Sequence, residues 1–196
     1  DDFIANESGT TTSTLITGWN LIPNPYLSNI DVSTLLQDNT NFDLAYKAVH
    51  VWDAKFQRYI ALTADIPSVI EWNNSLNNAL NATNNIAPFQ AFWVKALASP
   101  SSDATANEEI KLVTAHRTVE DNANFFKTSP PLIRLKLATL NEEYSDQSVI
   151  AFSDESTNGT DYNDALKLNS LNKNTPNLSS VAEGTRLSIN RLSNPA

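Results

Sequence analysis

Short runs of β-branched and aromatic residues recur along the chain, with clusters of Asn, Asp, Pro and Ser between them. Such residues favour strands because branched and flat side chains pack well on a pleated, half-buried surface. The clearest runs are 14–22, 46–53, 58–62, 89–96, 109–115, 132–138, 147–153 and 185–190. The pattern predicts an all-β protein: an antiparallel, jelly-roll-like β-sandwich, built as one body or as two adjoining sandwiches.

The distribution of apolar residues within the runs predicts which strands are central and which are half-exposed. Runs 46–53 and 89–96 carry apolar side chains on both faces, as is typical of central strands. In run 132–138, three apolar side chains alternate with two basic ones, namely Ile133, Leu135 and Leu137 with Arg134 and Lys136. This alternation predicts a strand whose apolar face lies in the core and whose basic face lies in solvent.

Only segments 32–37, 75–82 and 162–168 show helix-like spacing, and each is too short to be stable without tertiary support. The polar stretch 99–108 divides the chain near its middle. We therefore expect an N-terminal arm or first strand at 1–17, a first sandwich half at 18–98, a linker or long loop at 99–108, and a second half at 109–196.

Composition limits what the chain can be. Its 196 residues are 41% hydrophobic, enough for one or two compact domains. There is no cysteine for disulfides or thiolate metal sites, and a net charge of -9 disfavours nucleic-acid partners. No apolar run approaches the roughly 20 residues of a transmembrane helix, so no such segment is expected. Because the chain starts with Asp1 and lacks methionine, we expect a piece of a longer precursor.

The sequence offers few groups for catalysis. His50 and His116 are the only histidines, the nucleophile motif G-x-S-x-G is absent, and the four glycines are scattered. Two carboxylates could still meet across a cleft as in a glycosidase, but no pair stands out. We expect a protein that is not an enzyme and that needs no cofactor, with calcium as the one open alternative.

Several motifs occur in a defined order: GWNLIPNPY at 18–26, SNID at 28–31, VWD at 51–53, IAPFQAFWVKA at 86–96, FFK at 125–127, DYNDALKL at 161–168 and LSIN at 187–190. This order resembles large secreted and cell-surface proteins of the Bacteroidetes type IX secretion pathway, in which the region lies upstream of a C-terminal sorting domain. The resemblance implies an extracellular or outer-surface location. Pro23 stands where the family usually has glycine, and no sorting domain follows within the chain.

Within the first motif, Trp19, Leu21 and Ile22 are expected to be buried. Asn20 and Asn24 are expected to bond backbone groups of the turns with their side-chain amides. The alternative is a sugar-binding surface, which would need the Trp19 indole to be exposed.

A second aromatic and amide-rich segment is the predicted ligand site: Trp72, Asn73, Asn74 and Asn77. An exposed indole can stack on a sugar ring while neighbouring amides bond the sugar hydroxyls. The structural alternative is a short amphipathic helix held by Trp72, Leu76 and Leu80.

The predicted metal site is the acidic segment that contains Asp154, Asp161 and Asp164, because calcium selects oxygen ligands from such loops. The spacing does not match an EF-hand loop. The structural alternative is that Asp161 or Asp164 caps a short helix at 165–168.

These features together predict a non-catalytic structural or adhesive module of a secreted bacterial surface protein, including a building block of a surface filament or matrix. The second hypothesis is a carbohydrate-binding, lectin-like module. The third is a subunit that polymerises by strand exchange through the Thr-rich arm 1–14. Expected partners are other surface proteins, further copies of the chain, or glycans.

Overall fold

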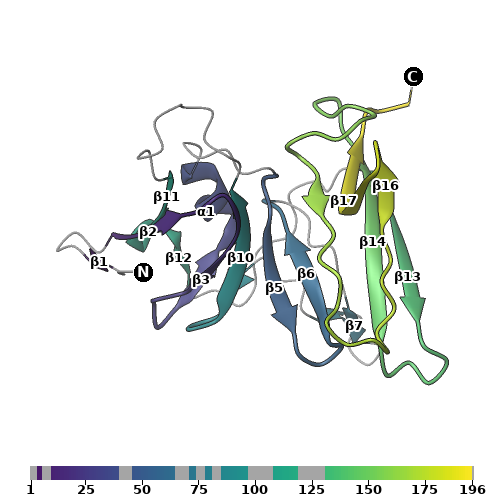
Figure 1. Ribbon diagram of the computed structural model, residues 1–196, viewed down its shortest axis with the longest axis horizontal. Helices are drawn as coiled ribbons and strands as arrows, with labels where there is room; N and C mark the ends of the chain where they lie inside the picture. The colour runs from purple at the N-terminus through teal and green to yellow at the C-terminus, as the bar shows by residue number, and fades with distance from the viewer. Residues whose placement is uncertain are drawn as a thin grey trace.

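The computed structural model describes residues 4–5, 10–39, 46–64, 71–73, 78–80, 85–96, 108–118 and 131–195, without the side chains of 4–5, 71–73, 78–80 and 108. These residues form five sheets, one short α-helix and one 3-10 helix. Figure 1 shows the sheets side by side along the long axis, with the N-terminal part at one end and the C-terminal part at the other. The prediction of an all-β, sandwich-like fold is confirmed. Neither described helix is long and apolar enough to cross a membrane.

The middle sheet has the order β3-β10-β5-β6 and is antiparallel throughout. Its strands are β3 (Gly18–Pro23), β10 (Ala91–Ala96), β5 (Val49–Asp53) and β6 (Arg58–Leu62). The two inner strands, β10 and β5, come from the runs with apolar residues on both faces, so their predicted central position is confirmed.

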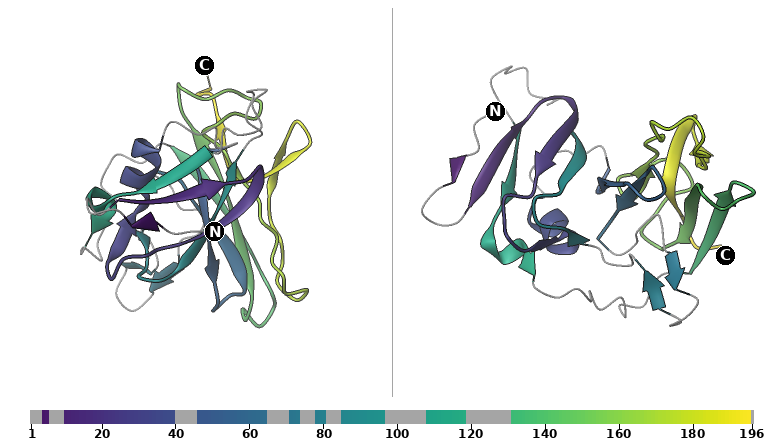
Figure 2. Two further views of the ribbon diagram at one scale, coloured as in Figure 1. Left: turned by 60° about the vertical axis from the view of Figure 1, so that its left-hand side comes forward. Right: turned by 90° about the horizontal axis from the view of Figure 1, so that it is seen from below.

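Two small sheets and two helices cover one face of the middle sheet (Figure 2). The first sheet is β1 (Ile4–Ala5), β2 (Thr11–Leu15) and β11 (Glu108–Leu112); the second is β12 (Arg117–Thr118), β4 (Asn29–Asp31) and β9 (Asn85–Ile86). The helices are α1 (Val32–Asp38) and the 3-10 turn η1 (Thr114–His116). The core between these layers comprises Leu15, Ile22, Ile30, Val32, Leu35, Leu36, Val49, Val51, Ile60, Leu62, Ile86, Phe92, Val94, Ala96, Ile110 and Leu112.

The C-terminal sheet contains β13 (Leu132–Ala138), β14 (Ser145–Phe152), β17 (Thr185–Leu192), β15 (Ala165–Leu166) and β16 (Ser180–Ala182). All its pairs are antiparallel except β14 with β17, which run parallel. A second core joins this sheet to the middle of the molecule and comprises Ala48, Ala61, Val149, Ala151, Ala165 and Ile189, with Leu132 against it. The β5–β6 region thus contributes to both cores.

The structure moves two predicted boundaries. Run 14–22 is two strands, β2 and β3, which belong to different sheets. The chain turns between them at Gly18, whose φ of 101° suits glycine because it has no Cβ. The first body also includes β11 and β12, because β11 pairs with β2 and β12 with β4. The division predicted at 99–108 therefore does not separate the two bodies.

One of the three predicted helices forms. The helix α1 begins after Asp31, whose carboxylate accepts a hydrogen bond from the Thr34 N–H at 2.9 Å. Segment 75–82 instead contains β8 (Asn78–Leu80), which pairs with β7 (Glu71–Asn73). Segment 162–168 contains β15, paired with β17. Both helix predictions were wrong because cross-strand pairing overrides a short apolar spacing.

The predicted orientation of β13 was also wrong. Leu135 and its apolar neighbours two residues away are about half exposed, at 46–50%, whereas Arg134 is half-buried and Lys136 is exposed as predicted. Burial lowers the pKa of Arg134 to about 10. The period-two alternation is present, but its apolar side faces outward.

Candidate interaction surfaces

Two of the four predicted sugar-binding residues lie in the strand β7. Trp72 and Asn73 lie in β7, opposite Ala79 and Asn78 of β8. Their side chains, and the residues Asn74 and Asn77, lie outside the described part of the chain. The helical alternative for this segment is contradicted, and the ligand site there stays a prediction.

The three predicted calcium ligands bond protein groups. Asp161 accepts from the N–H groups of Thr157 and Asn163, at 2.9 and 2.8 Å. The buried Asp164 accepts from the N–H groups of Arg191 and Asp161, at 2.7 and 2.9 Å, and burial raises its pKa. Asp154 accepts from the Asn194 amide at 2.6 Å. Among the described residues no group of three or more acidic or histidine side chains could hold a metal ion.

His50 joins the middle sheet to the C-terminal sheet. Its Nε2 lies 2.8 Å from the carbonyl oxygen of Leu166 and therefore carries the proton. Its Nδ1 is buried and has no hydrogen-bond partner in the described structure. The Trp19 ring packs against the imidazole in a T-shaped arrangement, with centroids 5.1 Å apart. Burial lowers the pKa of His50 from 6.5 to about 4, and nearby Lys167 acts in the same direction.

His116 is equally buried but has different partners. The Val113 N–H donates to its Nδ1 at 3.3 Å, and its Nε2 lies 3.0 Å from the Asp38 carboxylate at the end of α1. The two histidines therefore hold different layers together and do not form a shared site.

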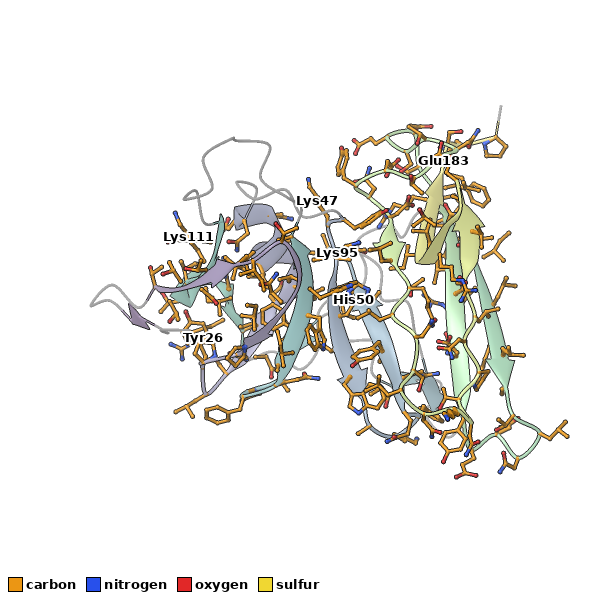
Figure 3. The ribbon with its side chains drawn as sticks, viewed as in Figure 1. Tyr26, Lys47, His50, Lys95, Lys111 and Glu183 are labelled. Carbon is orange, nitrogen blue, oxygen red and sulfur yellow. The ribbon has the colours of Figure 1, made fainter. Side chains whose placement is uncertain are left out.

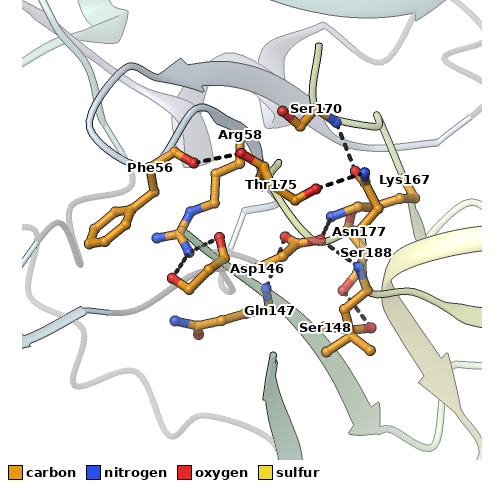
Figure 4. A network of polar contacts seen from close by, with 12 residues as sticks. Phe56, Arg58, Asp146, Gln147, Ser148, Lys167, Ser170, Thr175, Asn177 and Ser188 are labelled. Atoms are coloured by element: carbon orange, nitrogen blue, oxygen red, sulfur yellow. Dashed lines mark hydrogen bonds and ion pairs between the residues drawn. The ribbon is translucent and has the colours of Figure 1, made fainter. Parts of the chain in front are cut away.

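A buried polar network ties β6, β14 and the segment between β15 and β16 together (Figure 4). Lys167 forms an ion pair with Asp146, whose carboxylate also accepts the N–H of Leu178 at 2.6 Å. Arg58 donates to the carbonyl and hydroxyl oxygens of Ser145, at 2.8 and 2.9 Å, and pairs with Asp53 at 3.2 Å. Each charge of the network has a protein partner. Because these partners lie on different elements, the network connects the layers.

Within the first motif, the expectation for the asparagines is confirmed. Asn20 bonds both backbone groups of Ile16, at 2.9 and 2.7 Å. Asn24 is buried and bonds the carbonyl oxygens of Ser28 and Ala87, at 3.0 and 2.9 Å. The expectation for Leu21 was wrong, because this side chain is half exposed.

Asn24 brings two exposed apolar residues close together. Because one amide nitrogen bonds the carbonyls of Ser28 and Ala87, the loop that carries Leu27 lies against the turn that carries Phe89. Leu27 is 82% exposed and Phe89 is 68% exposed.

Phe89 occupies an unusual backbone position. It is the third residue of a turn closed by a 3.0 Å bond from the Gln90 N–H to the Ala87 carbonyl, and its φ is 60°. With Pro88 second, this is type II turn geometry, in which glycine normally stands third. A bulky side chain there carries backbone strain, which is often found at functional positions. Sequence reasoning placed Phe89 in a strand, although the preceding proline was a signal for the turn.

Arg117 adds a positive charge beside this pair. Its Nε donates to the Ser28 hydroxyl at 2.9 Å, and its guanidinium lies 5.5 Å from the centroid of the Tyr26 ring. Figure 3 labels Tyr26 at the N-terminal end of the molecule. We call Leu27, Phe89 and Arg117 the loop tip.

A second exposed region lies on β13 and the turn after it. The apolar side chains of Ile133, Leu135 and Leu137, which we call the β13 stripe, are each about half exposed. Leu140 in the following turn is fully exposed, and Glu142 and Glu143 beside it are also exposed. We call Leu140, Glu142 and Glu143 the hairpin end.

A third region is aromatic and lies on the middle sheet. The register places Trp93 opposite both Leu21 and His50, Lys95 opposite Trp19, and Trp52 opposite Tyr59. Opposed residues share a face and residues two apart do so as well, so Trp19, Trp52, Trp93 and Tyr59 project from the same side. All four are half-buried.

Comparisons with known proteins give one match. No curated protein and no solved structure matches the chain. The model of a family described as a domain of unknown function, DUF8693, matches residues 3–195. Because this match spans nearly the whole chain, the protein belongs to that family.

Proposed function

We propose that this chain is a non-catalytic structural or adhesive module of a secreted bacterial surface protein, located outside the cell or on its outer surface. The observation that carries the proposal is the β13 stripe. Three apolar side chains of a strand at the end of its sheet order remain about half exposed. Contiguous apolar surface of this kind typically marks an interaction site.

The position of the stripe supports this role. Strands at sheet edges can pair with another chain, so natural proteins usually protect them with charges, prolines or bulges. Here β13 is seven residues long and pairs with β14 in an unbroken register, and its charges Arg134 and Lys136 alternate with the apolar residues, so they do not lie on the apolar side. Its outward apolar residues would gain free energy from burial against a partner, roughly 25 cal/mol for each Å² of apolar surface removed from water.

The interior of the molecule supports a non-catalytic role. Both histidines and the buried charges form bonds that hold layers or loops together. The resemblance to secreted surface proteins supports the proposed location, and the stripe supplies the surface through which such a module would attach.

Adhesion under flow tests the proposal. Beads coated with the chain should be retained on a surface coated with the same chain or with outer-membrane material, and retention should fall strongly for I133T/L135T/L137T. Threonine is β-branched and therefore suits a strand, while it removes most of the apolar surface. Val181→Thr, an exposed apolar change on β16, is the matched control and should retain wild-type adhesion. Equal retention of the wild type and the triple variant contradicts the proposal.

The aromatic face of the middle sheet favours a second candidate function, carbohydrate binding. Indole rings can stack on sugar rings, and Trp19 is half-buried rather than enclosed, beside the part of this face that His50 joins to the C-terminal sheet. A glycan array should then show binding that is lost in Trp93→Ala and kept in Phe89→Ala, which changes an aromatic residue elsewhere. An array without any bound glycan excludes this candidate.

A further inference from the structure

We propose that copies of this chain associate head to tail, with the loop tip of one copy docked on the hairpin end of the next. The inference rests on the proposed structural role and names the partner: a second copy of the same chain. Leu27 and Phe89 would pack against Leu140, while Arg117 would pair with Glu142 or Glu143.

The loop tip is preorganised for such a contact. Asn24 fixes the two backbone segments that carry Leu27 and Phe89, as shown by its bonds to the carbonyls of Ser28 and Ala87. The positive φ of Phe89 holds its side chain outward at a conformational cost. The bond to Ser28 fixes Arg117 next to the same loop. A rigid apolar pair with an adjacent cation loses little entropy on binding.

The hairpin end is also held in one conformation. The Thr139 N–H donates to the Tyr144 carbonyl at 2.9 Å, and the Glu142 N–H donates to the Thr139 carbonyl at 2.9 Å. Glu142 has a φ of 55°, and Asn141 donates to the Glu143 carboxylate at 2.9 Å. These bonds fix a turn that presents Leu140 between the strand β13 and the two carboxylates.

Charge complementarity selects this pairing. The chain carries a net charge of -9, so two copies repel each other unless the contact brings opposite charges together. Within the described structure Arg117 makes no ion pair with a carboxylate, and Glu142 and Glu143 make none with a base. Two loop tips would place cation on cation, and two hairpin ends would place acid on acid. Unlike ends therefore match while like ends repel.

The positions of the two surfaces decide the form of the assembly. The loop between β3 and β4 lies in the N-terminal part of the molecule and the β13–β14 turn at the far end of the C-terminal part, in both Figure 1 and the view from below in Figure 2. When the loop tip of one copy binds the hairpin end of another, the assembly still has one free loop tip and one free hairpin end after each copy is added. Such a heterologous contact extends into an open chain of copies unless its rotation closes a ring.

Sedimentation of the purified chain tests the inference. The average mass of the wild type should rise with concentration and fall with added salt, because salt screens the charge pairs. Each charge reversal alone, Arg117→Glu or the pair E142R/E143R, should weaken association at least about tenfold. An equimolar mixture of the two reversed variants should recover the large assemblies, since each acidic loop tip then meets a basic hairpin end.

Controls separate this contact from a general charge effect. Arg186→Glu and Glu155→Arg change exposed charges elsewhere and should leave association unchanged. A wild type that stays monomeric, association that survives both reversals, or a mixture that fails to recover overturns the inference. Loss of association in the control variants does so as well. Adhesion lost in I133T/L135T/L137T together with association that survives both charge reversals would leave the proposed function standing while the head-to-tail contact fails.

Discussion

His50 on β5 donates its Nε2–H to the carbonyl oxygen of Leu166 on β15 across 2.8 Å, so one imidazole joins the middle sheet to the C-terminal sheet. The ring is buried, and its second nitrogen has no partner in the described part of the molecule. The junction between the middle sheet and the C-terminal sheet therefore depends on a histidine that must remain neutral.

This arrangement predicts that acid weakens the fold. The pKa of His50 is about 4 in the folded chain and near 6.5 when unfolded, so the unfolded state binds more protons below pH 6.5. Stability present above pH 6.5 is lost as the pH falls toward 4, by about 3 kcal/mol. Urea unfolding at several pH values measures this loss. His50→Gln keeps a donor for Leu166 and should show a smaller acid loss; identical pH profiles for both proteins would contradict the assignment.

The buried pair of Lys167 and Asp146 predicts that removal of one partner lowers the free energy of unfolding more than removal of both. Asp146→Asn should cost about 3–5 kcal/mol of unfolding free energy, because it leaves a buried ammonium without its counter-charge. Burial already lowers the pKa of Lys167, and Asp146 opposes this effect. Adding Lys167→Met should recover part of the loss, since the unpaired charge is then removed. Additive costs in the double-mutant cycle would show that the two groups act independently.

The strained turn at Phe89 predicts a substitution that stabilises the fold. Phe89→Gly should raise the free energy of unfolding by up to about 1 kcal/mol, because relief of a strain of about 1–3 kcal/mol exceeds the entropy cost of glycine. Phe89→Ala keeps a Cβ at positive φ and should show no such gain. Thermal melts compare the three proteins. If alanine stabilises as much as glycine, the effect comes from the exposed ring and not from the backbone.

The bonds of Asn24 predict that substitution of this one side chain strongly lowers the free energy of unfolding. Its amide nitrogen lies 2.9–3.2 Å from three backbone carbonyl oxygens, and its Oδ1 accepts the Tyr26 N–H at 2.9 Å. Asn24→Ala should therefore lower the unfolding free energy by about 2–4 kcal/mol, since buried carbonyl groups lose their donor. Asn24→Asp should be at least as harmful because it replaces that donor with a negative charge. Asn194→Ala, which removes one exposed bond, should cost less than about 0.5 kcal/mol. Comparable costs at both positions would contradict the role of Asn24.

The sequence by itself determined where strands form and which strands are central. Period-two alternation and turn residues act between near neighbours, so each of the eight predicted runs contains a strand, and α1 begins at its capping aspartate. The side-chain bonds of Asn20 were predictable for the same reason, because their partners lie within four residues.

Only the tertiary structure decided which face of a strand is buried and which distant residues meet. The alternation of Leu135 with Arg134 is the same whichever side faces inward, and packing of the whole sheet selects one. The loop that carries Leu27 and the turn that carries Phe89 meet through a bond from Asn24 to Ala87, which lies 63 residues along the chain. His50 and Leu166 are 116 residues apart. Contacts over such separations follow from the packing of layers, and no local pattern of residues records them.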